Sequence, residues 1–188
     1  MGRLIADTAF SQKPADKESL LAIKVGDLSI NDRIVELVGK IGEKIEVSEY
    51  VHMKGEAVVS YIHAGSKLGV LVSLKGVNGK DVTDAGKDVG MQIAAMNPLA
   101  VDAASIPAST IERERNIVIE TMKADPKMAG KTDEMLGKIA EGKLNAFFKE
   151  QTLLAQPFVK DAGVSVEAYL KSVDPSLKVT EFKRVALG

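Results

Sequence analysis

The pattern of apolar and polar residues first predicts an amphipathic helix between residues 30 and 41. Apolar side chains recur at helical spacing from Ile34 to Ile41, so one stripe of this helix is available for burial. Ser29 and Asp32 stand at the positions of a helix N-cap and its bonding partner three residues later. The helix is expected to end at Gly42.

After Gly42 the spacing of apolar residues changes to every second position, which predicts strands. Turn residues around Gly55 and Gly65 divide the segment into strands near 44–53, 57–63 and 67–75. Consecutive strands joined by short turns pair as antiparallel hairpins. The sequence therefore predicts a three-strand meander with one face to bury.

A further helix is predicted after a turn at residues 78–79, and Asn97 with the following proline ends it. Its apolar face consists of Ala85, Val89, Ile93 and Met96. Gly86 and Gly90 also lie on this helix, where each costs about 1 kcal/mol relative to alanine. We expect close packing of the helix on the sheet to be the reason for these glycines.

Two long, charged helices are predicted in the second half of the chain, over Thr110–Lys123 and Thr132–Glu150. Ser109 and Glu112 form a capping-box pattern at the start of the first helix. Because the apolar stripes face one another and the outer faces are charged, the two helices are expected to form an antiparallel hairpin, 109–150, that protrudes from the body.

The remaining patterns are shorter. They predict helices over Arg3–Phe10, Asp16–Ile23 and Val166–Val173, the last of them capped by Ser165, and a strand over Lys178–Leu187. The first two helices are expected to support the sheet, whereas the last strand needs a sheet partner from elsewhere. We therefore predict an α+β fold of two small lobes with antiparallel sheets packed by helices. These are an N-terminal lobe, 1–106, with the meander, and a C-terminal lobe, 107–188, carrying the helical hairpin.

Composition narrows the classes of function. The chain has 188 residues, enough for one domain or two small ones. Its 25 Lys and Arg against 26 Asp and Glu give a net charge of -1, which disfavours direct binding to nucleic acid or acidic membranes. Cysteine is absent, which excludes disulfides and thiolate metal sites. No apolar run approaches the roughly 20 residues that span a bilayer, so we expect a cytoplasmic protein.

Two segments resemble phosphate-binding loops without meeting the motif. Gly130-Lys131-Thr132 follows a predicted helix where the motif requires a strand, and the segment GVNGKD at 76–81 has an aspartate in place of the magnesium-binding hydroxyl. Both are interpreted as turns. The sequence thus predicts no catalytic residue, no nucleotide site, no metal site and no cofactor.

The two histidines are the side chains whose unperturbed charge changes near neutral pH. In the predicted meander His52 and His63 lie roughly 17 Å apart, which argues against a shared site. His52 is interpreted as a surface strand residue. His63 stands at a strand end, on the face of Val59 and Tyr61. It is either a turn histidine bonded to backbone or a contact residue for a partner.

Four segments carry a resemblance to a known family. They are KIGEKIEV at 40–47, SYIHAGSKLGVLVSL at 60–74, DVGMQIAAMNPLAV at 88–101, and KIAEGKLNAFFKEQTLLAQPFVKD followed by SVEAYL within 138–170. In this order they resemble elongation factor Ts, the nucleotide exchange factor for elongation factor Tu. That family normally begins with a ubiquitin-associated-like helical module and a Thr-Asp-Phe-Val motif. Neither precedes Ile5, so the resemblance is to the core, or dimerisation, region.

The resemblance implies a translation elongation factor that binds the GTPase elongation factor Tu and promotes GDP release, not an enzyme acting on covalent bonds. It implies that Ile41, Gly42 and His63 contact that partner. Each also has a structural explanation, since Ile41 fits the apolar stripe of its helix and Gly42 fits the helix end. No cofactor is implied, and the sequence leaves open whether the chain forms a homodimer.

Two other functions remain as alternatives. One is a structural or assembly module that binds a protein partner through the helical hairpin, without exchange activity. The other, an enzyme that uses His63 with a carboxylate, is less well supported because local sequence places no second polar group beside His63. In the family an Asp-Phe element disturbs the magnesium and nucleotide site of elongation factor Tu, and this element has no counterpart in the sequence. From this we expect docking with poor acceleration of GDP release.

Overall fold

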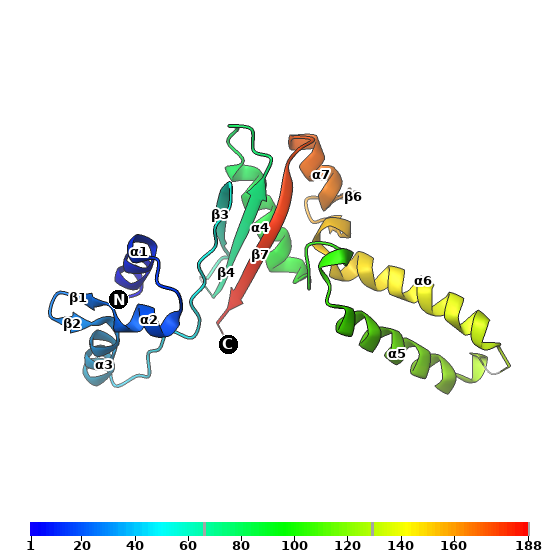
Figure 1. Cartoon of the computed structure of the whole chain (residues 1–188), viewed down its shortest axis with the longest axis horizontal. Helices are drawn as coiled ribbons and strands as arrows, with labels where there is room; N and C mark the ends of the chain where they lie inside the picture. The colour runs from blue at the N-terminus through cyan, green and yellow to red at the C-terminus, as the bar shows by residue number, and fades with distance from the viewer. Residues whose placement is uncertain (66, 129, 188) are drawn as a thin grey trace. The chain divides into compact units, whose positions relative to one another are not determined.

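The computed structural model describes residues 1–65, 67–128 and 130–187. Over these residues the chain has seven α-helices and three small antiparallel sheets, which confirms the predicted α+β class. The chain forms two compact units, Met1–Met53 and Lys54–Gly188. Figure 1 shows the elements of each unit.

The first unit consists of three helices and one short strand pair around a small core. Its elements are α1 (Gly2–Gln12), α2 (Lys17–Ala22), β1 (Lys24–Val25), β2 (Leu28–Ser29) and α3 (Ile30–Ile41). Leu20, Ile30 and Ile34 are buried at its centre, with side chains of α1 packed around them. Helices α1 and α2 thus share a core with α3, whereas the sequence analysis expected them to support the sheet.

Helix α3 begins with the predicted capping box. The Asp32 N–H donates to Ser29 Oγ at 3.0 Å, and the Ser29 N–H donates to Asp32 Oδ2 at 3.2 Å. The Ser29 hydroxyl also donates to Asp32 Oδ2 at 2.6 Å. This bond, and then the one from the Ser29 N–H, hold the pKa of the Asp32 carboxyl below its usual value. Two backbone donors that the helix leaves unpaired are satisfied in this way.

The predicted strand at 44–53 is wrong, because this segment has no strand pairing in the structure. Its residues Ile45, Val47 and Tyr50 pack on the core of the first unit. The Tyr50 hydroxyl also donates to the Pro14 carbonyl at 3.2 Å. A period of two requires only that alternate side chains be buried, and a helical surface meets that requirement as a sheet does.

The main sheet lies in the second unit and has the strand order β3, β4, β7. β3 (Ala57–Ile62) and β4 (Leu68–Lys75) form the second hairpin of the predicted meander. The third strand is β7 (Lys178–Ala186), which pairs antiparallel with β4. The last strand of the chain therefore finds its partner in the hairpin, and the meander as predicted does not form.

The packing units differ from the predicted lobes. The boundary between the compact units lies at Met53/Lys54, and the sheet joins β3 and β4 from the predicted lobe 1–106 to β7 from the predicted lobe 107–188. Whether residues 1–106 and 107–188 act as separate lobes toward a partner remains a prediction.

Helix α4 (Thr83–Met96) packs on the sheet through its glycines. A Cβ atom added to Gly86 would lie 2.4 Å from Val59, and one added to Gly90 would lie 2.5 Å from Tyr61. These distances confirm the predicted reason for the two glycines, because real Cβ atoms do not approach so closely. Val89 and Ile93 are fully buried, but Met96 at the end of the predicted stripe is 48% exposed.

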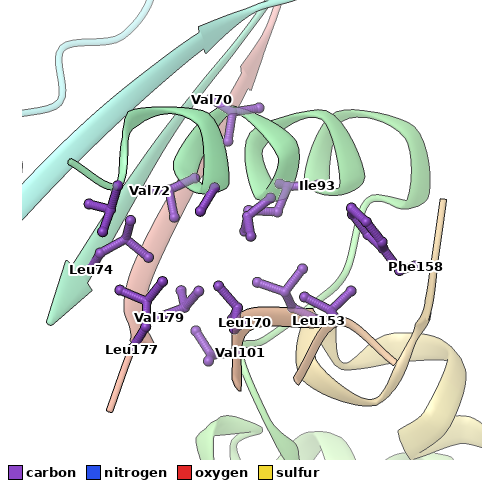
Figure 2. Close-up of a cluster of buried hydrophobic side chains, with 14 of the residues drawn as sticks. Val70, Val72, Leu74, Ile93, Val101, Leu153, Phe158, Leu170, Leu177 and Val179 are labelled. Carbon is purple, nitrogen blue, oxygen red and sulfur yellow. The ribbon is translucent and has the colours of Figure 1, made fainter. Parts of the chain in front are cut away.

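The hydrophobic core of the second unit fills the side of the sheet that α4 covers (Figure 2). Short elements complete it: η1 (Ala103–Ser105), η3 (Leu153–Ala155), β5 (Pro157–Phe158), β6 (Asp161–Ser165) and α7 (Val166–Val173). Helix α7 has the predicted bounds and the predicted cap, since the Ala168 N–H donates to Ser165 Oγ at 3.1 Å. Its Leu170 is buried in this core.

Polar contacts fix α4 to α7. Asp88 accepts hydrogen bonds from the Tyr169 hydroxyl at 2.8 Å and from Lys160 Nζ at 2.5 Å. The Tyr169 ring stacks on Phe158 with ring centroids 4.2 Å apart. Burial, and then the bond to Asp88, raise the pKa of Tyr169 to about 12.

The two predicted long helices are α5 (Ala108–Ala124) and α6 (Asp133–Gln151), joined through η2 (Pro126–Met128). They run side by side (Figure 1) and bury Met122, Leu136 and Ala140 between them. Thr132 caps α6, but the capping box predicted at Ser109 is wrong, because α5 begins at Ala108 after Pro107. That this pair protrudes remains a prediction.

Candidate partner-binding site

Ile41 is the last residue of α3, and its side chain is 51% exposed. The structural explanation considered for Ile41 was burial in the apolar stripe of its helix. The stripe is buried at Ile30 and Ile34, and Val38 still packs on the same core, but Ile41 beyond it does not. Core packing therefore does not account for an isoleucine at this position.

Gly42 follows directly and ends α3 in the left-handed conformation, with φ 77°. Its N–H donates to the Val38 carbonyl at 2.8 Å, as expected of a glycine at a helix C-terminus. A Cβ atom built on Gly42 would have no neighbour within 4 Å. The helix end is explained locally, and the surface around Gly42 is open.

His63 lies at the end of β3 in the second unit and is exposed. Its backbone N–H donates to the Leu68 carbonyl at 2.9 Å, which continues the hairpin pairing. Its Nδ1 atom is 3.1 Å from the Tyr61 hydroxyl, and the two ring centroids are 6.0 Å apart. The side chain is thus bonded to a tyrosine, not to the backbone as the turn interpretation proposed.

Tyr61, the partner of His63, packs closely on α4. A Cβ atom added to Gly90 would lie 2.5 Å from Tyr61 Cβ and 3.2 Å from the first atom of its ring. The predicted strand pattern placed Tyr61 on the same face as His63, but the bond between them was not predicted. The i, i+2 spacing in a strand is the signal that could have indicated it.

The two histidines lie in different compact units, since His52 belongs to the first and His63 to the second. The predicted strand position of His52 is wrong together with the strand at 44–53, although His52 is exposed as predicted. Among the described residues no group of three histidine or acidic side chains is placed to hold a metal ion.

Both segments that resemble phosphate loops contain turns. Gly130 has φ 88°, and the Lys131 N–H donates to the Met128 carbonyl at 3.2 Å. In the second segment Lys80 pairs with Asp174 at 2.5 Å. The bond from Lys80 is the first cause that holds the pKa of Asp174 well below its usual value.

A pocket of about 420 Å³ lies where α7 meets the start of β7. Its two carboxylates already have partners: Asp102 accepts from Ser105, and Glu167 pairs with Lys171 at 2.5 Å. His63 is not among the residues that line it. The pocket therefore does not bring His63 to a carboxylate, as the enzyme alternative requires.

The comparison with protein families decides the identity. The family described as Elongation factor TS matches the chain over residues 1–188. The chain belongs to the elongation factor Ts family.

Individual members of the elongation factor Ts family are also similar in sequence to this chain. Elongation factor Ts of Amoebophilus asiaticus is 48% identical over 184 residues, which cover 98% of this chain and 65% of that protein. Elongation factor Ts of Cytophaga hutchinsonii is 45% identical over 189 residues, which cover 100% of this chain and 66% of that protein. The chain thus spans about two thirds of the length of these curated relatives. In the part of the chain that the structure describes, no helix has the length and apolarity to cross a membrane.

Proposed function

We propose that this chain binds elongation factor Tu and promotes, though poorly, the release of GDP from it, as the core region of a guanine nucleotide exchange factor in translation elongation. The main support is membership of the elongation factor Ts family over residues 1–188. The exposure of Ile41 adds to it, because burial does not explain an apolar side chain there. Ile41, Gly42 and His63 are the proposed contact residues.

Nucleotide exchange depends on a coupling free energy between the exchange factor and GDP, which are two ligands of the same GTPase. An exchange factor that binds the nucleotide-free GTPase more tightly than the GDP-bound GTPase weakens the binding of GDP by the same ratio. A factor that binds both forms equally shifts nothing, however tightly it binds. The chain itself makes and breaks no covalent bond in this scheme, and its residues act by contact alone.

His63 suits such a contact because its position is set before the partner arrives. The bond to Tyr61 and the packing of Tyr61 on Gly90 fix its side chain on the end of the hairpin. Little side-chain freedom then remains to be lost on binding, which favours affinity. Gly42 contributes differently, since a glycine without near neighbours lets a partner backbone approach closely.

Two measurements test the proposal. Calorimetry measures binding of the chain to nucleotide-free elongation factor Tu, and a fluorescent GDP analogue reports the rate of release from the GDP form. We expect His63→Ala and Ile41→Ala each to weaken binding by at least about fivefold, since truncating an important interface residue costs more than about 1 kcal/mol.

His52→Ala is the matched control, because it removes an equally exposed histidine that the proposal does not place in the contact. Equal effects of the two histidine variants would contradict the assignment of His63. Binding without any faster release would support the alternative of an assembly module without exchange activity. Absence of binding by the unmodified chain would refute the proposed function.

A further inference from the structure

Two buried glutamines lie where helix α6 ends. Gln92 on α4 is fully buried, and Gln156 is 1% exposed. Gln92 Nε2 donates to Gln156 Oε1 and to the Pro157 carbonyl, at 3.1 Å each. Gln92 Oε1 accepts from the Val159 N–H at 2.8 Å. A buried amide costs free energy unless it is hydrogen-bonded, and both donors and the acceptor of Gln92 are bonded here.

Gln156 extends this connection to the helical hairpin of α5 and α6. Its Nε2 atom donates to the Glu150 carbonyl, in the last turn of α6, at 2.7 Å. The last carbonyls of a helix have no donor within the helix, and this bond satisfies one of them. The two glutamine side chains therefore join the end of α6 directly to α4.

The backbone makes a separate attachment between the helical hairpin and the segment that follows α4. The Leu99 N–H donates to the Gln151 carbonyl at 2.9 Å. The Leu153 N–H donates to the Ala100 carbonyl at 2.9 Å. A short row of bonds of this kind can act as a hinge, because the elements on its two sides can turn about it. The bonds of Gln92 are made from α4 itself, so they oppose such a turn.

Helix α4 also supports the His63 contact. Gly90 of α4 packs on Tyr61, which is bonded to His63. Gln92 follows two residues later, about 200° further around the helix, so the two contacts lie on nearly opposite sides of α4. The helix is thus connected to β3 on one side and to the base of the helical hairpin on the other.

We propose that Gln92 is a positioning residue that holds the helical hairpin in one direction relative to His63. Hydrogen bonds have preferred angles, whereas apolar contacts are non-directional, so Gln92→Leu would leave the space filled but the direction free. A protein that contacts both the helical hairpin and His63 then meets a preformed surface, and little freedom of the hairpin is lost on binding. The inference goes beyond nucleotide exchange, because it concerns the chain before any partner binds.

Pulse EPR distances in the free chain test the proposal. The chain contains no cysteine, so spin labels attach only to introduced cysteines. The hairpin pair, Glu141→Cys with Lys183→Cys, joins α6 to β7 and reports the direction of the helical hairpin. The body pair, Lys87→Cys with Lys183→Cys, joins α4 to the same strand and leaves the hairpin out. All three positions are exposed.

Each pair is measured in three backgrounds: wild type, Gln92→Leu and Val89→Ala. Val89 lies on the same helix and is fully buried in the core, so its truncation lowers stability without removing an amide bond. The three bonds of Gln92 together favour the held direction by about a hundredfold in population. We therefore expect Gln92→Leu to add a second distance for the hairpin pair and to leave the distance of the body pair unchanged.

A single, unchanged distance of the hairpin pair in Gln92→Leu would overturn the inference. A second distance in Val89→Ala would also overturn it, because loss of stability alone would then release the helical hairpin. The same holds for a broader distance of the body pair in Gln92→Leu, since α4 itself would have moved. If Gln92→Leu does not fold, Gln156→Met removes the bond to Glu150 and is judged by the same outcomes. These distances need no partner, so the proposed function is tested separately.

Discussion

Helices α3 and α4 both contain glycine, but they are held in place by different means. In α4, Gly86 and Gly90 lie where the helix is closest to the sheet. A Cβ atom added to Gly86 or to Gly90 would lie 2.4 or 2.5 Å from a side chain of β3. In α3 neither Gly39 nor the capping Gly42 has a neighbour within 4 Å of such an atom. Helix α3 instead has a full capping box, whereas the N-cap of α4 makes no side-chain bond. Tertiary packing holds α4, and local bonds at its start support α3.

The largest expected effect is that of Gly86→Ala in α4. The added methyl group would overlap the β-branched Val59 side chain, which cannot rotate away. We expect a loss of about 3 kcal/mol of unfolding free energy, because overpacking outweighs the small gain in helix propensity. Chemical denaturation of the whole chain measures this loss.

Gly39→Ala is the control and should stabilise the protein by up to about 1 kcal/mol, since the added methyl group meets no atom. Losses of similar size in both variants would refute the contrast between the two helices.

A smaller effect is expected for Ser29→Ala at the start of α3. It removes one arm of the capping box and should lower the stability of the first unit by about 1 kcal/mol. Hydrogen exchange of α3 amides reports this locally. Asn31→Ala in the first turn of α3 serves as the comparison, because Asn31 is exposed and takes no part in the capping box. If the Ser29 variant exchanged no faster than wild type, packing and not capping would hold α3.

The smallest effect appears only at high pH, at the contact of α4 with α7. Tyr169 has a pKa raised to about 12, above the ordinary tyrosine value of 10.0, so its neutral form is favoured in the folded state. Its contribution to stability is complete below pH 10 and is lost as the pH rises toward 12. Stability measured against pH should therefore fall over this range, and less so in Tyr169→Phe. Identical profiles of the two proteins would show that Tyr169 titrates normally.

Local signals were predicted well from the sequence, and pairings distant in the chain were not. The bounds of α7 and its Ser165 cap follow from adjacent residues and are correct. The partner of β7 is not encoded in any neighbouring residue, since any strand edge of suitable pattern satisfies its backbone groups. The burial of 44–53 against helices was missed for the same reason. Its period of two identifies which side chains are buried but not against what.

For the candidate site, too, local features were predicted from the sequence and features that depend on distant contacts were not. His63 was placed at the end of a strand from the pattern alone, and that position is correct. The exposure of Ile41 was not foreseen, because a helical stripe does not reveal how far the underlying core extends. The bond between Tyr61 and His63 was also missed. The packing of Tyr61 on Gly90 depends on contacts between α4 and the sheet that only the folded chain supplies.

The pairing of β4 with β7 also determines when the sheet can form during synthesis. β4 ends at Lys75, but its second neighbour begins only at Lys178. Until β7 has left the ribosome, the sheet holds only a two-stranded hairpin, which is marginal in water by itself. The edge of β4 stays unpaired while α4, α5, α6 and α7 are made, and an unpaired edge invites contacts with other chains. β7 is therefore the strand that completes the sheet and protects the nascent chain from misassociation.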